Sequence, residues 1–539
     1  MQGDPDRRPR AIRWSRVALV VHNWLGLKLA LVLAVVLLSG TLAVFRFEID
    51  RLVYPELRVI PAPSLASLDA IVAAVKAAYP DWGLGDDIPT GVGAGNLAIG
   101  IVGVSPDRGV RTIWVDPYRA AVQGDTPLVT PGFFLAKLHR DLFIPEWGIV
   151  IVCALAIVVA VSLVTGLIAY RRFWLGFLRR PRLRNLRILM IDLHKLVGLW
   201  TLWFSIVIAL TGLWYFWTLV GEEKLGFPQA VERRALPDPG DGRLQALGPT
   251  APEPVPLATA LARATALYPD FIATYVTLPG RHGAPLVFHG NRGEVLALNA
   301  TAIAVDSFSG EVLGANLASD APLSHRIGAM VNPLHYGDFG GLLSKTVWCL
   351  FGLLLSGVAI TGVAIFWART SRAAVRLMPS LLRAFHPWRG AMGWLKPLNW
   401  AVLVVTAIGA VLTAQFYSQG LATLPARYAP QDVGPWRLGA TLLAGLGDAS
   451  DPLKPAARVV AVVQYCPGCW DDIRRLWVDV GPAPPADGDW GQRVQGRPGF
   501  ASARVMLPDD LGGQRLWITA EGWDRRVHRS GWVLRKPAN

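Results

Sequence analysis

The apolar residues of this chain are gathered into five long blocks and are not scattered as in the core of a soluble protein. The blocks cover residues 24–45, 148–170, 196–217, 342–367 and 399–416. A helix needs roughly 20 apolar residues to cross a hydrocarbon layer of about 30 Å, and the first four blocks reach that length. The pattern therefore predicts a membrane α-helical protein with four spanning helices and a fifth, shorter one at 398–416.

Two of the polar stretches between these blocks share a second pattern. Residues 46–138 and 218–334 each contain a helix-periodic segment that ends at Tyr-Pro, followed by alternating residues that end in an Asp-containing turn. The first periodicity predicts a short helix and the alternation predicts strands, so we expect two α+β modules. The tail, residues 417–539, is rich in Trp, Gly and Pro and has strand-like runs such as ARVVAVVQY, which predict a small β-rich module.

The charge distribution gives these parts a direction across the membrane. The formal net charge is +14, and the basic residues cluster beside the predicted helices in residues 1–21, 171–193 and 368–397. By the positive-inside rule these segments are cytoplasmic, so both α+β modules, and the tail if the fifth helix spans, lie on the other side. This topological origin of the charge argues against nucleic-acid binding. A cleavable signal peptide is disfavoured because the first apolar run is long and no small-residue cleavage site follows it.

The chain contains one pattern twice. An offset of 172 positions superimposes His22 on His194, and an offset of 196 superimposes His139 on His335, with glycine motifs and outer modules that match as well. Because both copies enter from the cytoplasm, the repeat is parallel and implies a pseudo-twofold axis along the membrane normal. Each copy has a first histidine helix (22–45 or 194–217), a module, and a second histidine helix (139–170 or 335–367).

The repeat places the four histidines at two levels. His22 and His194 come at the cytoplasmic ends of their helices, whereas His139 and His335 precede their helices on the outer side. Ionisable side chains in membrane helices are costly and usually face a ligand or a partner. Two imidazoles that approach from opposite sides of a helical bundle suit haem iron, which with both axial positions filled transfers electrons and does not bind oxygen.

We therefore predict two b-type haems, with His22 and His194 as axial iron ligands of the inner one and His139 and His335 as those of the outer one. Chance interfacial histidines are the alternative. Pairing across levels is harder, because roughly 18 helical residues at about 1.5 Å each separate the two faces. Nearby cations could pair with the haem propionates or simply reach the membrane surface; they are Arg16, Lys28, Arg140 and Lys195.

Together these features resemble the PepSY-associated transmembrane family of bacterial inner-membrane proteins. The resemblance covers about residues 12–368 and rests on the four histidines, their Gly-Leu and Thr/Ser-Gly motifs, and the module ends VDPYRAAVQG and VDSFSGEVLG. The second end matches the family's Asp-x-x-x-Gly turn, whereas the first has Ala120 where that glycine is expected. The fifth helix and the tail lie outside the resemblance.

The resemblance implies a four-helix core bundle of two parallel repeats with two extracytoplasmic PepSY-like modules, in the bacterial inner membrane with a cytoplasmic N-terminus. Members include reductases of ferric siderophores, which implies an oxidoreductase that passes electrons outward for iron uptake. Reduction of the ferric iron would release it from the siderophore, because hard oxygen ligands hold ferrous iron less well than ferric iron. The sequence carries no cytoplasmic nucleotide-binding signature, so the expected donor is a membrane quinol or a separate cytoplasmic reductase. The alternative is a haem-free permease or a PepSY-type accessory protein that binds peptides or proteins.

Further candidates lie outside the paired histidines. His325 and Tyr336 are predicted outer-side contacts for substrate or iron, with ordinary surface residues as the alternative. Cys466 and Cys469 form a CPGC motif, which we interpret first as a structural disulfide and otherwise as a redox dithiol or half of a metal site. It is not a c-type haem motif, because Trp470 stands where a histidine is required.

Overall fold

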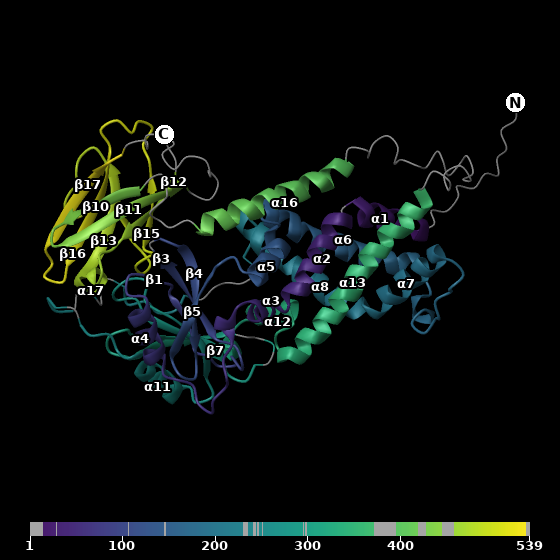
Figure 1. Ribbon diagram of the computed structural model, residues 1–539, viewed down its shortest axis with the longest axis horizontal. Coiled ribbons are helices and arrows are strands. Elements are labelled where there is room, and N and C mark those ends of the chain that lie inside the picture. The colour runs from purple at the N-terminus through teal and green to yellow at the C-terminus, as the bar shows by residue number, and fades with distance from the viewer. Residues whose placement is uncertain are drawn as a thin grey trace. The chain divides into compact units, whose positions relative to one another are not determined.

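The structure is a computed structural model of the 539-residue chain. It describes residues 14–370, 395–418, 427–444 and 458–534, apart from residues 29, 106, 145–146, 230–234, 241–243, 245–246, 251, 295 and 297–298. The predicted cytoplasmic segments 1–21 and 368–397 therefore fall largely outside the described residues. The chain divides into two compact units (Figure 1). One comprises Met1–Arg46, Phe134–Ala230 and Met330–Val411, and the other comprises Phe47–Phe133, Val231–Ala329 and Leu412–Asn539.

The first unit is helical. The helices that form it or reach into it are α1 (Trp14–Lys28), α2 (Ala30–Ala43), α5 (Pro131–Asp141), α6 (Trp147–Ala169), α7 (Leu186–Trp200), α8 (Leu202–Tyr215), α9 (Glu223–Leu225), α12 (Leu323–Tyr336), α13 (Gly341–Thr370) and α16 (Leu395–Ser418). A π-helical segment, Phe216–Glu222, joins α8 to α9.

Three helical stretches of this unit are long and apolar enough to cross a membrane. They are Trp147–Ala169, Leu202–Leu225 and Gly341–Ile365, and they coincide with three of the predicted spans. The first predicted span is less regular, because the apolar helix Leu31–Ala43 is followed by α3 (Arg46–Val53) at an angle of 68°. It counts as a fourth span only if this bent pair is taken as one segment.

The predicted fifth span falls short within the described residues. The described apolar part of α16 is Ala401–Gln415. At about 1.5 Å per residue this stretch extends only about 22 Å, less than the roughly 30 Å of the hydrocarbon layer. Five spans were expected, and among the described residues three helices, or four with the bent pair, are long and apolar enough to be one.

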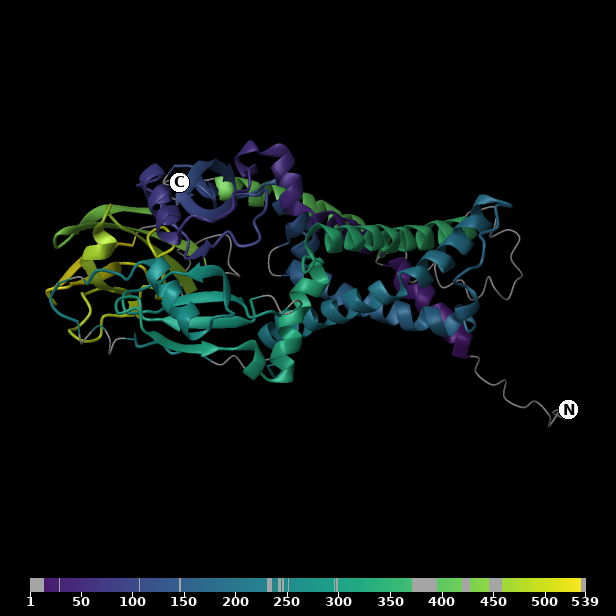
Figure 2. The same cartoon turned by 90° about the horizontal axis from the view of Figure 1, so that it is seen from below.

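The packing of the helices follows the sequence repeat. Helix α6 packs against α1 and α8, and helix α13 packs against α7 and α2. Each long helix thus contacts the first part of the histidine helix in its own repeat and the second part of the corresponding helix in the other repeat. Figure 2 shows α13, in green, running alongside the blue helices of this unit.

Both outer stretches fold as a helix on an antiparallel sheet. In the first α+β module, α4 (Leu68–Ala78) accompanies a sheet of order β1 (Gly83–Leu84), β3 (Ile99–Ser105), β4 (Gly109–Asp116), β5 (Ala121–Pro127). In the second, α11 (Leu257–Leu267) accompanies a sheet of order β2 (Asp87–Pro89), β6 (Ile272–Thr277), β7 (Leu286–Asn291), β8 (Thr301–Val305), β9 (Val312–Asn316).

The two modules share a strand and a core. Strand β2 comes from the first stretch of sequence but pairs with β6 of the second module, with Ile88 opposite Val276. The apolar faces of α4 and α11 bury Ile71 and Ala260 in one cluster with residues of both sheets. The modules are therefore one hydrophobic body, which neither could complete alone.

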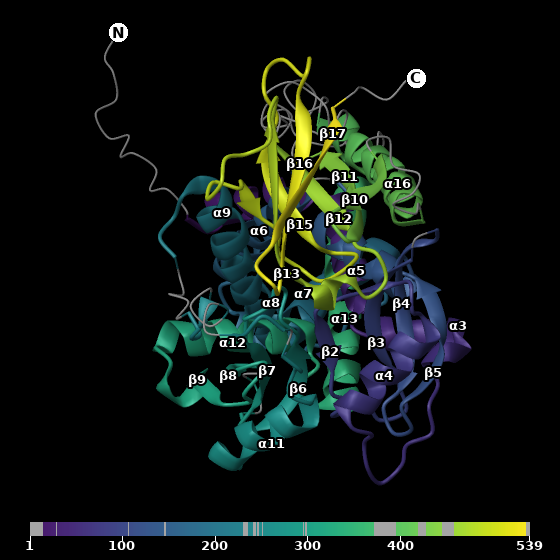
Figure 3. The same cartoon turned by 90° about the vertical axis from the view of Figure 1, so that its left-hand side faces the viewer.

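The tail forms the predicted β-rich module, defined here as residues 427–534. One sheet has the order β10 (Arg427–Val433), β11 (Trp436–Ala444), β12 (Arg458–Gln464), β15 (Ser502–Met506). The other has the order β14 (Gln492–Arg493), β13 (Ile473–Gly481), β16 (Arg515–Gly522), β17 (Val527–Val533). Alternating residues of both sheets, such as Leu438 and Ile518, fill a common core. Figure 3 shows these strands in yellow and yellow-green beside the two α+β modules of the same unit.

Candidate cofactor site

The four predicted ligand histidines lie on four helices of the first unit. His22 lies on α1, His194 on α7, His139 on α5 and His335 on α12. All four side chains are half-buried. The last two come near the ends of short helices that directly precede the long apolar helices α6 and α13.

The fold brings the four rings together in two pairs. The ring centroids of His22 and His194 are 6.2 Å apart, and those of His139 and His335 are 5.9 Å apart. An imidazole nitrogen binds a metal at about 2 Å and lies about 1 Å from the ring centroid, so two rings on opposite sides of one metal atom have centroids about 6 Å apart. Two rings in direct contact also have centroids separated by about this distance. The separation therefore admits a shared metal without requiring one.

One nitrogen of each ring is already hydrogen-bonded. The Nδ1 contacts are His22 to Ser162 O at 2.8 Å, His139 to Val36 O at 2.8 Å, His194 to Val358 O at 3.0 Å and His335 to Thr211 Oγ1 at 2.9 Å. A carbonyl oxygen only accepts, so in the first three rings Nδ1 is the donor. The hydroxyl of Thr211 donates to Val207 O at 2.8 Å, so its oxygen accepts from His335 Nδ1.

This arrangement fixes the tautomer of all four imidazoles. With the proton on Nδ1, the Nε2 lone pair is free to bind a metal, and a bond from Nδ1–H to a carbonyl is the usual outer support of a metal-binding histidine. Each Nδ1 partner belongs to the same sequence repeat as its histidine, whereas the neighbouring ring belongs to the other repeat. Both pairs are therefore built across the pseudo-twofold axis.

Glycines lie against three of the four rings. A Cβ on Gly40 would lie 2.5 Å from His139 Cε1, and Cβ atoms on Gly166 and Gly362 would lie 3.3 and 3.4 Å from the Cε1 atoms of His22 and His194. Gly212, which matches Gly40 in the second repeat, lies instead against Ala156. Gly40, Gly166 and Gly362 thus allow an imidazole to approach the helix backbone.

The two pairs lie at different levels of α13. Trp348 of α13 donates from its indole nitrogen to Leu334 O, the carbonyl next to His335, at 2.8 Å. His194 is bonded at Val358, ten residues further along the same helix. At about 1.5 Å per residue the two contacts are separated by about 15 Å along the helix.

The outer pair has aromatic neighbours that the sequence pattern did not single out. The Tyr215 ring centroid is 5.2 Å from that of His335, and the Tyr215 hydroxyl donates to Asn332 Oδ1 at 2.5 Å. Tyr336, which was predicted, has its ring centroid 5.9 Å from the His335 ring and is 45% exposed. Tyr215 could have been predicted as a neighbour of His335 from its position, because it lies one turn after Thr211 on α8.

The structure does not place His325 or the predicted propionate-binding cations in contact with the histidine pairs, as far as their side chains are described. His325 lies near the start of α12, and the ten helical residues between it and His335 correspond to about 15 Å. Arg140 pairs with Asp141 at 3.1 Å, and Lys195 lies 5.3 Å from the centroid of the Tyr170 ring. Arg16 is exposed, and the side chain of Lys28 lies outside the described residues.

The CPGC motif contains a disulfide between Cys466 and Cys469 and belongs to the second unit. It is therefore in a different folded unit from the histidine pairs.

Comparison with known proteins identifies two regions. The family model described as PepSY-associated TM region matches residues 19–369, and a model described as an uncharacterised conserved protein matches residues 398–535. The chain is also similar to the uncharacterized protein PA4219 of Pseudomonas aeruginosa, with 27% identity over 267 residues that cover 47% of this chain and 68% of that protein. Because the first match includes both histidine pairs and more than half of the sequence, the chain belongs to the PepSY-associated TM family.

Proposed function

We propose that the chain is a haem b-containing membrane oxidoreductase that carries electrons across the bilayer to an extracytoplasmic acceptor. The observation that carries this proposal is the presence of two histidine pairs at two levels of a helical membrane protein, each ring with Nδ1 bonded to its own repeat and Nε2 free.

The number of protein ligands favours haem over a bare metal ion. Among the residues that the structure describes, no group of three or more His, Cys, Asp or Glu side chains could hold a metal ion. Each pair offers only two nitrogens, whereas a structural zinc ion takes four protein ligands. Haem iron has two axial positions, and each pair offers two nitrogens that could fill them.

Haem with two histidine ligands supplies one-electron transfer. The residues of this chain would orient and tune it. The acceptors bonded to Nδ1, which are three carbonyl groups and the Thr211 hydroxyl, would fix the orientation of each imidazole ring and raise its basicity. The apolar surroundings would restrict water and lower the local dielectric constant. The ring pairs at two levels then define an inner and an outer station for the electron.

The proposed acceptor is a ferric siderophore, and the proposed role is iron uptake. This part rests on the resemblance to ferric-siderophore reductases. One electron converts ferric iron to the softer ferrous ion, which hard oxygen ligands release more readily. The donor is a membrane quinol or a separate cytoplasmic reductase.

The test is a reduced-minus-oxidised absorption spectrum of the protein purified in detergent, with a pyridine haemochrome titration. We expect about two haems per chain in the native protein and about one in His22→Ala and in His139→Ala. His289→Ala, which changes a histidine of β7 in the other unit, is the matched control and should keep both.

Haem-free protein that is correctly folded would contradict the proposal and favour a permease or a PepSY-type accessory protein. Loss of both haems in His289→Ala would show that the spectrum reports general misfolding. A separate experiment tests the acceptor. The reduced native protein should reduce a ferric siderophore, and His139→Ala should lose this reaction.

A further inference from the structure

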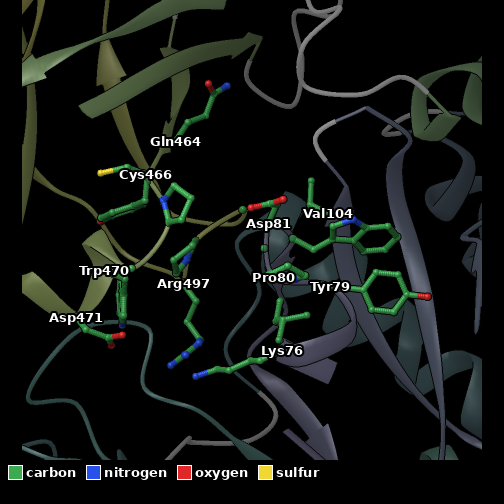
Figure 4. Close-up of a pocket in the computed structure, with 18 of the residues that line it drawn as sticks. Lys76, Tyr79, Pro80, Asp81, Val104, Gln464, Cys466, Trp470, Asp471 and Arg497 are labelled. Carbon is green, nitrogen blue, oxygen red and sulfur yellow. The ribbon is translucent and has the colours of Figure 1, made fainter. Parts of the chain in front are cut away.

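A cavity of about 660 Å³ lies within the second unit, between the first α+β module and the tail module. This volume is in the range of pockets that bind small organic molecules. Figure 4 shows that one wall comes from the end of α4 and the residues after it, and the other from the CPGC segment and the segment around Arg497.

The cavity has an excess of positive charge. Its lining includes four basic side chains and two acidic ones: Lys76, Arg427, Arg437, Arg497, Asp81 and Asp471. Lys76, Arg437 and Arg497 form no ion pair within 4 Å of a carboxylate of the described chain. In Figure 4 the charged ends of Lys76 and Arg497 extend toward the same part of the cavity. Burial lowers the pKa of Arg497, and the carboxylates of Asp86 and Asp471 oppose this, so a further anion would add to the stabilisation of the charged guanidinium.

The second property of the cavity is aromatic surface. Trp470, Tyr465 and Trp82 line it, and the Arg497 guanidinium lies 5.8 Å from the centroid of the Trp470 ring. The Tyr465 and Trp470 rings are in edge contact, with centroids 5.6 Å apart. A flat ring can therefore lie against apolar surface while an acidic group reaches a cation.

The wall that carries Trp470 is held rigidly. The Cys466–Cys469 disulfide closes the turn before it, and Gly468 in that turn has φ +76°, which favours glycine. The carbonyl of Trp470 is 2.8 Å from His282 Nε2, and the next carbonyl, Asp471 O, accepts from Trp523 Nε1 at 2.8 Å.

The wall that carries Arg497 is also fixed. Gly496 N donates to Gly280 O at 2.8 Å, and the backbone of Gly499 lies directly against that of Gly83. A binding surface that is ordered in advance loses less conformational entropy when a ligand arrives.

We propose that this cavity binds a small aromatic anion, a ligand in which a ring carries a carboxylate or phenolate group. The ring packs on Trp470, and the acidic oxygens pair with Arg497 and Lys76. This site is separate from the histidine pairs and does not depend on whether they hold haem.

The test is isothermal titration calorimetry of the full-length protein in detergent with salicylate as the probe. We expect saturable binding with a Kd of about 1 mM or lower. Benzamide, which lacks the charge, and cyclohexanecarboxylate, which lacks the aromatic ring, should each bind about ten-fold more weakly.

Three variants locate the site. Arg497→Gln should weaken salicylate binding about ten-fold or more, because a charge-assisted hydrogen bond is lost. Lys76→Gln, at an exposed position, should weaken it about three-fold. Trp470→Leu should remove the preference for salicylate over cyclohexanecarboxylate. Arg504→Gln makes the same change as the first variant at an exposed position of β15 and should leave binding unchanged.

Because Arg497 is half-buried, the unfolding temperature of each variant is recorded. If Arg497→Gln does not fold, Lys76→Gln and Trp470→Leu answer the question. Absence of saturable salicylate binding overturns the proposal. Equal affinity for benzamide overturns the anionic part, and native affinity in folded Lys76→Gln and Trp470→Leu overturns the location.

Discussion

At the scale of residues, the two α+β modules end their β4 and β8 strands in the same turn. Asp116 Oδ1 accepts from the backbone N–H groups of Tyr118 and Arg119, and Asp306 Oδ1 accepts from those of Phe308 and Ser309. Each turn then needs a residue with positive φ. That residue is glycine in the second module and alanine in the first.

We predict that Ala120→Gly stabilises the protein. Ala120 has φ +52° and Gly310, at the equivalent position, has φ +71°. A Cβ in this left-handed region costs about 1 kcal/mol, so its removal should raise the free energy of unfolding by somewhat less, because glycine also gains freedom in the unfolded chain. Thermal unfolding measures the change.

The matched control for this prediction is Gly310→Ala, which should destabilise by at least as much. Its new Cβ would also come within 3.0 Å of Arg263 Nη1. A lower unfolding temperature for Ala120→Gly would contradict the strain argument.

The sequence repeat was a sufficient guide to which histidines lie together. The offsets match His22 to His194 and His139 to His335, and these are the pairs of rings that the fold brings to about 6 Å. The Nδ1 partners could not be predicted, because three are backbone carbonyls and any residue supplies one. The fourth, Thr211, breaks the symmetry of the repeat through its side chain.

At the scale of elements, hydropathy located the long helices but missed their breaks and ends. An average over a window does not distinguish a straight helix from one that bends, so the 68° change of direction before α3 was not predicted. Strand β2 was also unpredictable, because three residues are too few for an alternating pattern and its partner β6 lies almost 190 positions away.

The contact between α2 and the outer histidine leads to a second prediction. Gly40→Ala would place a Cβ 2.5 Å from both Cε1 and Nδ1 of His139 and must displace the ring from Val36 O. On the proposed function, the haemochrome titration should fall from about two haems to about one. The spectrum should then resemble that of His139→Ala.

His289→Ala is again the control for this experiment. It changes β7 in the other unit, so it should leave the haem content unchanged. Retention of both haems by Gly40→Ala would show that the His139 ring can move without loss of the ligand.

At the scale of the whole molecule, the tail module is anchored to the α+β modules of its unit by buried polar contacts. Arg474 donates from Nη2 to Leu244 O at 2.7 Å and pairs with Glu521 at 2.5 Å, both within the interior. His282 contacts Trp470 O and the rings of Trp470 and Trp523. The tail, which the sequence predicted only as a small β-rich module, is thus part of a larger folded unit.

We predict that acid weakens this attachment through His282. Burial lowers the pKa of His282 in the folded state, opposed by the Trp470 carbonyl and Asp471 and assisted by Arg497 and Arg493. The unfolded chain binds the proton at its ordinary pKa of 6.5, so this contribution to stability is complete above about pH 6.5 and declines as the pH falls toward the folded-state pKa.

The measurement is thermal unfolding of the second unit at pH 7.5 and at pH 5.5. The unfolding temperature should fall less between these two pH values in His282→Gln than in the native protein. Gln keeps a side-chain amide for the Trp470 carbonyl but does not titrate. An equal decrease in both proteins would assign the acid sensitivity to other groups.

The way in which each imidazole is held makes any shared ligand a cross-link. Every ring is tied through Nδ1 to its own repeat, and it faces a ring of the other repeat. The free energy of binding one group between two such rings is consequently also free energy of association between the repeats. Two repeats produced as separate chains should then associate more tightly when that group is supplied, in addition to the association that strand β2 and the packed helices already provide.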